Sequence, residues 1–231
     1  MQSRKPVTLG LDTSGAPLIA ALEKDGKIYA RRRKGIKQER LLFPAVSSAL
    51  AATGAELKDI KRIFIVRGPG RFTGIRISLT FASMLKYLNQ TEVRGATLFE
   101  VLRRQVISSK KFAAWTKNNP SGAVAVVLHA FREEYFLQIF DGQNNPPAWL
   151  SREELLQRLA AYPAPLLLAG SDKNGAPLAD LTDCAYAYAD EKDCFVRPAT
   201  LVQMAQDDSL AQDALEPLYL KPARFELVTP K

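Results

Sequence analysis

The chain has 231 residues, 47% of them apolar and 24% charged, which fits a folded globular protein and excludes a disordered one. No apolar run approaches the length of a membrane span, and the N-terminal residues lack the apolar stretch of a secretory signal. Cys184 and Cys194, the two cysteines, are too few for a disulfide scaffold and do not suggest a metal pair. We therefore expect a cytoplasmic protein with no metal and no membrane contact.

The net charge of +8 is divided unevenly along the chain. Residues 1–112 hold 22 Lys and Arg against 8 Asp and Glu, a net of +14, and residues 113–231 hold 10 against 16, a net of −6. This asymmetry predicts different neighbours for the two halves, with nucleic acid or an acidic protein surface facing the basic half. The densest cations, which either contact the phosphates of a nucleic acid or form a solvated strand end, are Arg31, Arg32, Arg33, Lys34 and Lys37.

The first part of the chain predicts an antiparallel meander followed by alternating helices and strands. Asp25-Gly26 between two extended runs is a strong hairpin signal, and Pro44 fits best in the first turn of the helix that follows. The expected strands are Val7–Asp12, Leu18–Glu23, Ile28–Arg33, Ile63–Val66 and Glu92–Arg94. The expected helices are Glu39–Thr53, Thr73–Leu88 and Leu98–Val106.

A weaker copy of this pattern follows residues 109–122, which are predicted to be a linker because of their turn residues. The expected strands are Ala123–His129, Glu134–Phe140 and Leu166–Gly170, and a last strand or docking segment is expected within residues 217–230. The expected helices are Arg152–Tyr162, begun by Ser151, and Pro198–Asp207. The order of elements predicts an α/β protein with mixed sheets in two related lobes.

Residues 66–80, VRGPGRFTGIRISLT, pass from a strand through a tight turn into a helix. Gly68 and Gly70 permit backbone conformations that a side chain would forbid, and Thr73 is well placed to cap the helix. A helix start beside glycines and Arg71 can also bind an anion, but the lysine of a P-loop is missing. We favour the interpretation that the turn sets the direction of the helix.

Two motifs, LGLDTSG at 9–15 and GPGRFTGIRI at 68–77, together resemble the TsaB (YeaZ) family, and PLYLK at 217–221 is similar to a closing segment of that family. The resemblance runs from about residue 7 to 107 and returns near 217–224. It implies an actin-like ATPase fold of two lobes with mixed sheets flanked by helices. Residues 1–107 would form the N-terminal lobe, 108–216 the C-terminal lobe, and 217–231 a tail packed back on the body.

The resemblance also implies a non-catalytic scaffold. Such a protein binds a catalytic paralogue, TsaD, assisted by a small ATPase, TsaE, and the pair places a threonylcarbamoyl group on the adenosine beside the tRNA anticodon. The first two helices would bind TsaD, ATP would sit at most at an interface of the complex, and tRNA would be contacted indirectly or through the basic lobe. The implied partner contacts are Leu42, Val46, Gly68, Gly70, Arg71, Phe72, Thr73, Gly74, Ile75, Arg76 and Leu79.

Several positions depart from the family pattern. Arg71 replaces a usual small residue, Gln38-Glu39 lacks the histidine of a Glu-His pair, and residues 129–131 read His-Ala-Phe where many members have Asp-Ala-Arg. These changes describe a divergent member. They bear most directly on residue-level contacts with a partner.

The residues do not predict chemistry by this chain alone. A vestigial phosphate loop is expected at Asp12, Thr13, Ser14 and Gly15. A magnesium-dependent ATPase needs a second carboxylate, but the corresponding strand of the second lobe ends at His129, with no acid before Glu133. His129 is also the single histidine, so the paired-histidine metal site of the paralogue cannot form. We expect no catalytic residue and no cofactor of its own.

Two alternatives stay open. The first is an ATPase or small-molecule kinase on the same fold, because Asp12 and its loop could hold a nucleotide phosphate. The second is a homodimeric scaffold unrelated to tRNA, because the same helical surface could pair with a second copy.

Overall fold

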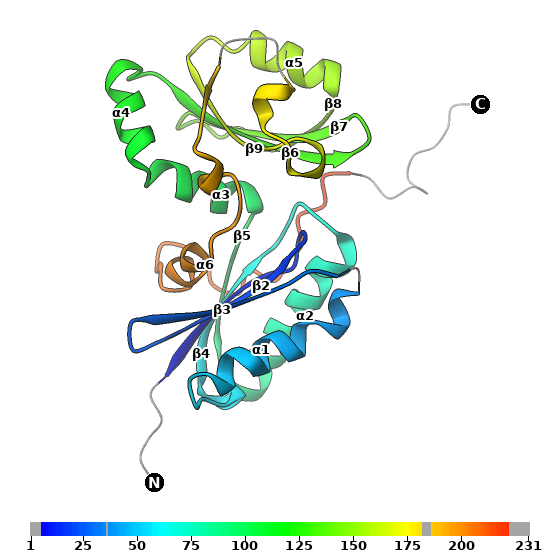
Figure 1. The fold of residues 1–231 in the computed structure, drawn as a ribbon, viewed down its shortest axis with the longest axis vertical. Helices are drawn as coiled ribbons and strands as arrows, with labels where there is room; N and C mark the ends of the chain where they lie inside the picture. Colours follow the sequence, from blue (N-terminus) through cyan, green and yellow to red (C-terminus); the bar gives the residue numbers. More distant parts are fainter. Residues whose placement is uncertain (1–5, 36, 182–185, 222–231) are drawn as a thin grey trace, which may run out of the picture. The chain divides into compact units, whose positions relative to one another are not determined.

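The computed structural model describes residues 6–35, 37–181 and 186–221, and these form two compact units, each with a five-stranded mixed sheet (Figure 1). Unit 1 comprises Met1–Val101 and Val196–Leu218, and unit 2 comprises Leu102–Phe195 and Tyr219–Lys231. Residues 196–218 thus group with the N-terminal unit, whereas the sequence predicts most of them in the second lobe.

The sheet of unit 1 has the strand order β3-β2-β1-β4-β5. Its strands are β1 (Val7–Asp12), β2 (Leu18–Lys24), β3 (Lys27–Arg33), β4 (Ile60–Val66) and β5 (Glu92–Ala96). The first three are antiparallel neighbours, while β1–β4 and β4–β5 are parallel. The predicted hairpin is confirmed, since Asp25 and Gly26 have the positive φ angles, 55° and 74°, that its tight turn requires.

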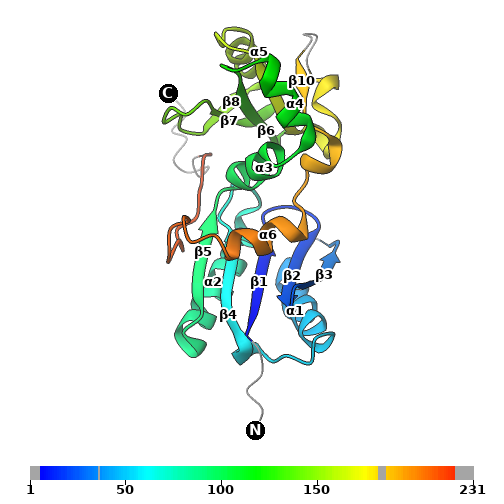
Figure 2. The same ribbon diagram turned by 90° about the vertical axis from the view of Figure 1, so that its left-hand side faces the viewer.

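Helices cover both faces of this sheet (Figure 2). On one face lie α1 (Leu42–Ala51) and α2 (Phe72–Asn89), and on the other lies α6 (Pro198–Ala205). Strand β1 is therefore buried along its whole length, as expected for a central strand with both faces covered. The packing of α6 is close: a Cβ at Gly10 would lie 2.5 Å from Leu201 Cβ.

Two 3₁₀ turns and one further helix complete the N-terminal part of unit 1. A 3₁₀ turn, η1 (Gln38–Arg40), precedes α1, so the regular helix begins after Glu39 and keeps Pro44 in its first turn. Another, η2 (Leu57–Asp59), leads into β4. Helix α3 (Leu98–Ile107) follows β5 and contains the point at which unit 1 gives way to unit 2.

The sheet of unit 2 has the order β10-β9-β6-β7-β8. Its strands are β6 (Ala123–Phe131), β7 (Glu134–Phe140), β8 (Ala148–Ser151), β9 (Leu166–Ser171) and β10 (Ala187–Tyr188). The first three are again antiparallel, and β6–β9 and β9–β10 are parallel. The predicted second copy is confirmed, including two short strands, β8 and β10, that the sequence pattern does not reveal.

The linker predicted at residues 109–122 is wrong, because most of it is the helix α4 (Lys110–Asn118). Ser109 caps this helix by accepting a hydrogen bond from Phe112 N at 3.0 Å, and the turn residues after it mark only where the helix ends. The other helix of the unit is α5 (Arg152–Ala160), with the expected cap at Ser151. Three 3₁₀ turns complete it: η3 (Lys173–Gly175), η4 (Leu178–Asp180) and η5 (Glu191–Asp193).

Residues 217–221 form no strand. Leu218 N donates to Arg67 O at 2.8 Å, and the Lys221 ammonium pairs with Glu134 in unit 2. The rest of the predicted tail, residues 222–231, and Cys184 lie outside the described residues. None of the helices within the described ranges is long and apolar enough to cross a membrane.

Candidate functional site

The two sequence motifs of unit 1 pack directly against each other. Arg71 N donates a hydrogen bond to Ser14 O at 2.6 Å, and Thr13 Oγ1 donates to Gly74 O at 2.7 Å. Glycine is required at Gly70 and Gly74 because a Cβ at these positions would overlap the carbonyl oxygens of Ser14 and Thr13. The loop after β1 and the start of α2 are therefore one interlocked structure.

Gly68, at the start of the turn before α2, is also closely packed. Its φ of 119° is unfavourable for other residues, and a Cβ there would lie 2.6 Å from Leu218 O. Its own carbonyl accepts from Leu98 N at 2.6 Å, and its peptide bond to Pro69 is cis. These contacts support the interpretation that the turn sets the direction of α2.

Asp12 closes the loop after β1 instead of facing solvent. Its side chain is buried, and its Oδ1 accepts hydrogen bonds from Ser14 N at 2.9 Å and Ser14 Oγ at 2.6 Å. Burial raises the pKa of this carboxyl, and the two bonds from Ser14 partly oppose the increase. Thr13 and Ser14 are buried as well, while Gly15 is half-buried and its carbonyl accepts from the Gln38 amide.

The predicted cap at Thr73 is wrong. Helix α2 begins at Phe72, so Arg71 occupies the N-cap position without a side-chain cap bond, and Thr73 is an exposed residue of the first turn. The interlock with the loop after β1 holds this helix start in place of a side-chain cap. Beside it lies a polar hollow of about 340 Å³ lined by residues that include Lys37, Gln38 and Arg71.

An apolar groove of about 460 Å³ lies between η1, α1 and α2. Phe43 and Phe72, which line it, are 49% and 51% exposed although aromatic. Phe43 packs edge-to-face on Phe81 with ring centres 5.4 Å apart, and the Arg76 guanidinium lies 4.0 Å from the centre of the Phe72 ring. The lining residues are Glu39, Leu42, Phe43, Phe72, Thr73, Arg76, Ile77, Thr80, Phe81 and Met84.

The predicted partner contacts divide by burial. The structure buries Leu42, Val46, Gly68, Gly74, Ile75 and Leu79, and it exposes Gly70, Arg71, Phe72, Thr73 and Arg76. Of the buried residues, Val46, Ile75 and Leu79 belong to the core side of α1 and α2, whereas Leu42 also lines the groove. The sequence analysis did not include Phe43 among the partner contacts. Its aromatic side chain lies outside the apolar stripe of α1, and this position could have indicated an exposed apolar surface.

The residues of the predicted basic cluster differ in exposure and in hydrogen bonding. Arg32, Arg33, Lys34 and Lys37 are exposed. Arg31 instead donates from Nε to Ser48 Oγ at 2.8 Å and from Nη2 to Ser48 O at 3.1 Å. Arg31 is therefore tied to the last turn of α1, where the free carbonyls of a helix favour a cation.

His129, the single histidine, lies at the end of β6 in unit 2. His129 Nε2 lies 2.9 Å from Arg132 O, and its ring packs edge-on against Tyr135, so it braces the turn between β6 and β7. Glu133 in that turn pairs with Lys173. Within the described ranges, no three His, Cys, Asp or Glu residues are placed to hold a metal ion together. The geometry offers a docking groove more clearly than an active site.

Comparison with known proteins gives consistent similarities. A family model described as TsaD, tRNA N6-adenosine threonylcarbamoyltransferase, matches residues 36–115. Proteins called "tRNA threonylcarbamoyladenosine biosynthesis protein TsaB" match from Escherichia coli, 26% identical over 59% of this chain, and from Bacillus subtilis, 24% identical over 71%. The matched part spans 56% of the Escherichia coli protein and 70% of the Bacillus subtilis protein.

Solved structures support the fold over nearly the whole chain. YeaZ from Pseudomonas aeruginosa superposes with a TM-score of 0.66 at 22% identity, covering 93% of this chain and 100% of that one. A second structure, of a protein with similarity to peptidase YeaZ from the same species, gives 0.67 at 21% identity, with 94% and 100% covered. The predicted actin-like ATPase fold is confirmed. With its two motifs, the chain is therefore similar in sequence to the TsaB proteins and in fold to YeaZ.

Proposed function

We propose that this chain is a scaffold subunit in the formation of threonylcarbamoyladenosine in tRNA, and that it acts by binding a TsaD-type catalytic subunit. The observation that carries the proposal is the apolar groove of α1 and α2, with Phe43 and Phe72 about half exposed. Aromatic residues gathered at the centre of an exposed patch are typical of protein interfaces.

The range matched by the TsaD family model favours a TsaD-type partner. Residues 36–115 include both groove helices, so a TsaD-type protein is expected to carry an equivalent helix pair. Two equivalent pairs can meet about a pseudo-two-fold axis, as copies do in isologous dimers. Glu39 and Arg76 lie in the groove lining beside the apolar residues and can fix the register of such a contact.

The surroundings of Asp12 support a non-catalytic role. The carboxylate that an ATPase would use, Asp12, is buried and bonded to Ser14. We infer that the chain fixes an active conformation of its partner, and that a TsaE-type ATPase acts on the joint complex. Any ATP site would then be formed with the partner.

Two other functions are weighed against this one. An ATPase or small-molecule kinase would bind nucleotide by itself and lose it on Asp12→Ala, which isothermal calorimetry with ATP and Mg²⁺ can measure. A homodimeric scaffold would use the same groove to bind a second copy. In that case, loss of the gene would leave the tRNA modification intact.

The test is size-exclusion chromatography with light scattering on this chain mixed with the TsaD-type protein of the same organism. A heterodimer is expected, and it should disappear with Phe43→Glu or Phe72→Glu because each places a charge in the apolar groove. Tyr87→Glu is the matched control, since Tyr87 is 87% exposed on α2 but does not line the groove.

Folding of each variant is checked by circular dichroism, because Phe43 also packs on Phe81. Two separate peaks at micromolar concentration, or a heterodimer that survives both groove variants, would overturn the proposed interface. Ile75→Glu and Leu79→Glu are unsuitable probes, since both side chains lie in the core.

A further inference from the structure

The structure sorts the cations of unit 1 into two sets. On the side of β4 and β5, two of them pair with distant acids: Lys86 Nζ lies 2.7 Å from Asp213, and Arg94 Nη2 lies 2.9 Å from Asp208. Both aspartates belong to the segment that follows α6 and groups with unit 1. The returning segment therefore supplies acids that the first 101 residues lack.

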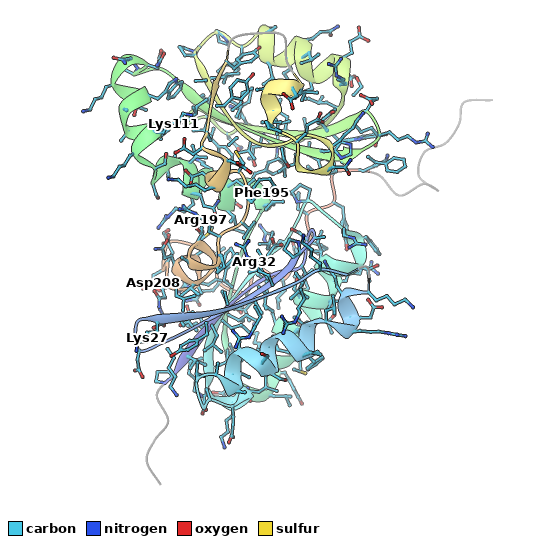
Figure 3. All side chains as sticks on the ribbon, viewed as in Figure 1. Lys27, Arg32, Lys111, Phe195, Arg197 and Asp208 are labelled. Carbon is cyan, nitrogen blue, oxygen red and sulfur yellow. The ribbon has the colours of Figure 1, made fainter. Side chains whose placement is uncertain are left out.

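The cations along β3 and the residues that follow have no such partners. β3 is an edge strand of its sheet. Figure 3 shows Lys27 near the β2–β3 turn and Arg32 farther along the strand. None of the exposed cations on this stretch forms an ion pair with another residue of the described ranges. We call this set the basic edge; it comprises Lys27, Arg32, Arg33, Lys34, Lys37 and Arg40.

Counting charge by unit shows that the basic edge is the main excess. Unit 1 holds 19 Lys and Arg against 12 Asp and Glu, a net of +7, and unit 2 holds 13 against 12, a net of +1. The contrast of +14 and −6 between sequence halves thus shrinks, because the basic residues 102–112 belong to unit 2 and the acidic residues 196–218 belong to unit 1. The basic edge supplies six of the 19 Lys and Arg residues of unit 1.

We propose that the basic edge binds phosphate groups of an RNA backbone, and that this RNA is the tRNA to be modified; the identity of the RNA rests on the proposed function. Guanidinium groups match phosphate oxygens with two parallel hydrogen bonds. The six residues include no aromatic side chain, so contacts go to the backbone instead of to stacked bases. From Lys27 to Arg33 the strand extends roughly 20 Å, which spans several phosphates.

The placement of the arginines favours RNA over an acidic protein surface. Arg32 and Arg33 are adjacent on a strand, so their side chains leave opposite faces of the sheet. A flexible phosphate backbone that follows the edge can reach both faces, whereas a flat protein surface reaches one. Arg31 is excluded from the basic edge because Ser48 holds it.

The experiment measures binding of the purified full chain to a fluorescent tRNA by anisotropy over a range of salt concentrations. The edge variant combines Arg32→Gln, Arg33→Gln and Lys34→Gln. The control combines Lys58→Gln, Arg62→Gln and Lys86→Gln, which removes the same charge from cations that pair with Glu56, Glu92 and Asp213. At about 50 mM salt the edge variant should bind at least ~10-fold more weakly, with the slope of log K against log salt reduced by roughly 2 to 3.

The control should change affinity by less than about threefold because its cations are already neutralised. Unchanged binding by the edge variant, or no measurable binding by the natural chain, would overturn the proposal. An equal loss in both variants would also overturn it, because net charge alone would then be responsible. If the edge variant bound tRNA normally but no longer bound the TsaD-type protein, the proposal would be overturned and the basic edge would be assigned to an acidic protein surface.

Both triple variants keep the groove, so heterodimer formation tests the proposed function separately. Arg31→Gln adds a comparison within the same strand. It should lower the unfolding midpoint, since Arg31 is bonded to α1, and leave the salt slope unchanged. A reduced slope in this variant would contradict the division between Arg31 and its neighbours.

Discussion

The two units share one strand order but differ in the helices that follow equivalent strands. After β4, unit 1 places the 18-residue helix α2, whereas after β9, the equivalent strand, residues 172–181 of unit 2 form the 3₁₀ turns η3 and η4. The groove between α1 and α2 therefore has no counterpart in the described part of unit 2. The same strand order thus carries the groove in one unit, because within the described residues only that unit has a long helix after this strand.

The units also differ in how they hold the end of the chain. Unit 1 fixes the segment after α6 with Arg94, whose side chain is 2% exposed. Unit 2 holds Lys221, 33% exposed, between an acid and two aromatic rings. This difference predicts a strong dependence of stability on the first anchor and a weak dependence on the second.

The largest effect is expected from Arg94→Met. Arg94 Nη1 donates to Asp207 O at 2.6 Å and Leu210 O at 3.1 Å, so its loss removes a charged donor from two partly buried carbonyls. Breaking such a buried charge network should lower the free energy of unfolding by about 2–3 kcal/mol, below the usual range because its acidic partners are partly exposed. Urea denaturation measures the change.

Arg62→Met is the matched control for this anchor. Arg62 pairs with the same acids, Glu92 and Asp208, but is 39% exposed, so the loss should stay below about 1 kcal/mol. Equal losses in both variants would show that burial of Arg94 adds nothing. The contrast between the two anchors would then have no energetic basis.

The next largest effect is expected where the loop after β1 packs against the start of α2 in unit 1. Gly74→Ala places a methyl group against Thr13 O and the Gln38 side chain and should destabilise by about 1–3 kcal/mol. Gly15→Ala, in the same pair of motifs, meets no atom within 4 Å and should change stability by less than about 0.5 kcal/mol. Thermal denaturation of both variants measures the difference.

A reversed order would favour a ligand-binding loop over a packed one. If Gly15→Ala were the more damaging change, the backbone of the loop after β1 would be the sensitive element. Nucleotide binding by the chain alone would then be the first property to measure.

The pH dependence of stability distinguishes the loops that follow the first strand of each unit. In unit 1 burial raises the pKa of Asp12, whereas unit 2 has no carboxylate until Glu133. Between the unfolded pKa of about 3.9 and the raised folded value, the folded protein binds more protons, so this group's contribution to stability falls as pH rises. Asp12→Asn should remove that fall, since an amide oxygen can still accept both bonds from Ser14.

The variant should therefore be more stable than the natural chain at pH 7 and similar to it below about pH 4. Urea denaturation across this pH range measures the effect. Ser14→Ala is the control, since it removes a donor to Asp12 and should destabilise at every pH. Lower stability of Asp12→Asn at pH 7 would mean that the ionised carboxylate is the stabilising form.

The central strands and α2 were predictable because their signals are local. β1 and β6 are short apolar runs, the hairpin has Asp25-Gly26, and α2 follows a glycine-rich turn. β8 and β10 were missed because four and two residues carry no periodic pattern. Helix α4 was not predicted because the turn residues that follow it were taken as evidence for a linker. Its amphipathic pattern is weak, since the helix buries no residue completely.

The site was predictable only to the level of its helices. Which side of α1 and α2 faces the core depends on the sheet beneath them, so the core residues Val46 and Ile75 were chosen and Phe43, which lines the groove, was not. The charge of unit 1 was misjudged for a similar reason. Asp208 and Asp213 are more than 100 residues from the cations they neutralise, and no local pattern indicates that return.

The smallest effect is expected from Lys221→Met, the anchor in unit 2. Its ammonium lies 5.0 Å from the centre of the Trp149 ring and 5.7 Å from that of Phe131, and it pairs with Glu134. Methionine keeps the apolar stem but loses the charge, so the free energy of unfolding should fall by only about 0.5–1 kcal/mol. Hydrogen exchange of the backbone amides at residues 218–221 should rise by a larger factor than the global stability implies.

Lys173→Met is the control, because Lys173 pairs with Glu133 in the turn that leads into β7. Its loss should leave exchange at residues 218–221 unchanged. If Lys221→Met were as damaging as Arg94→Met, the two units would hold the chain equally firmly, and the contrast between a buried and a half-exposed anchor would fail. If exchange at residues 218–221 did not rise, the aromatic rings and Glu134 would contribute nothing to holding this segment.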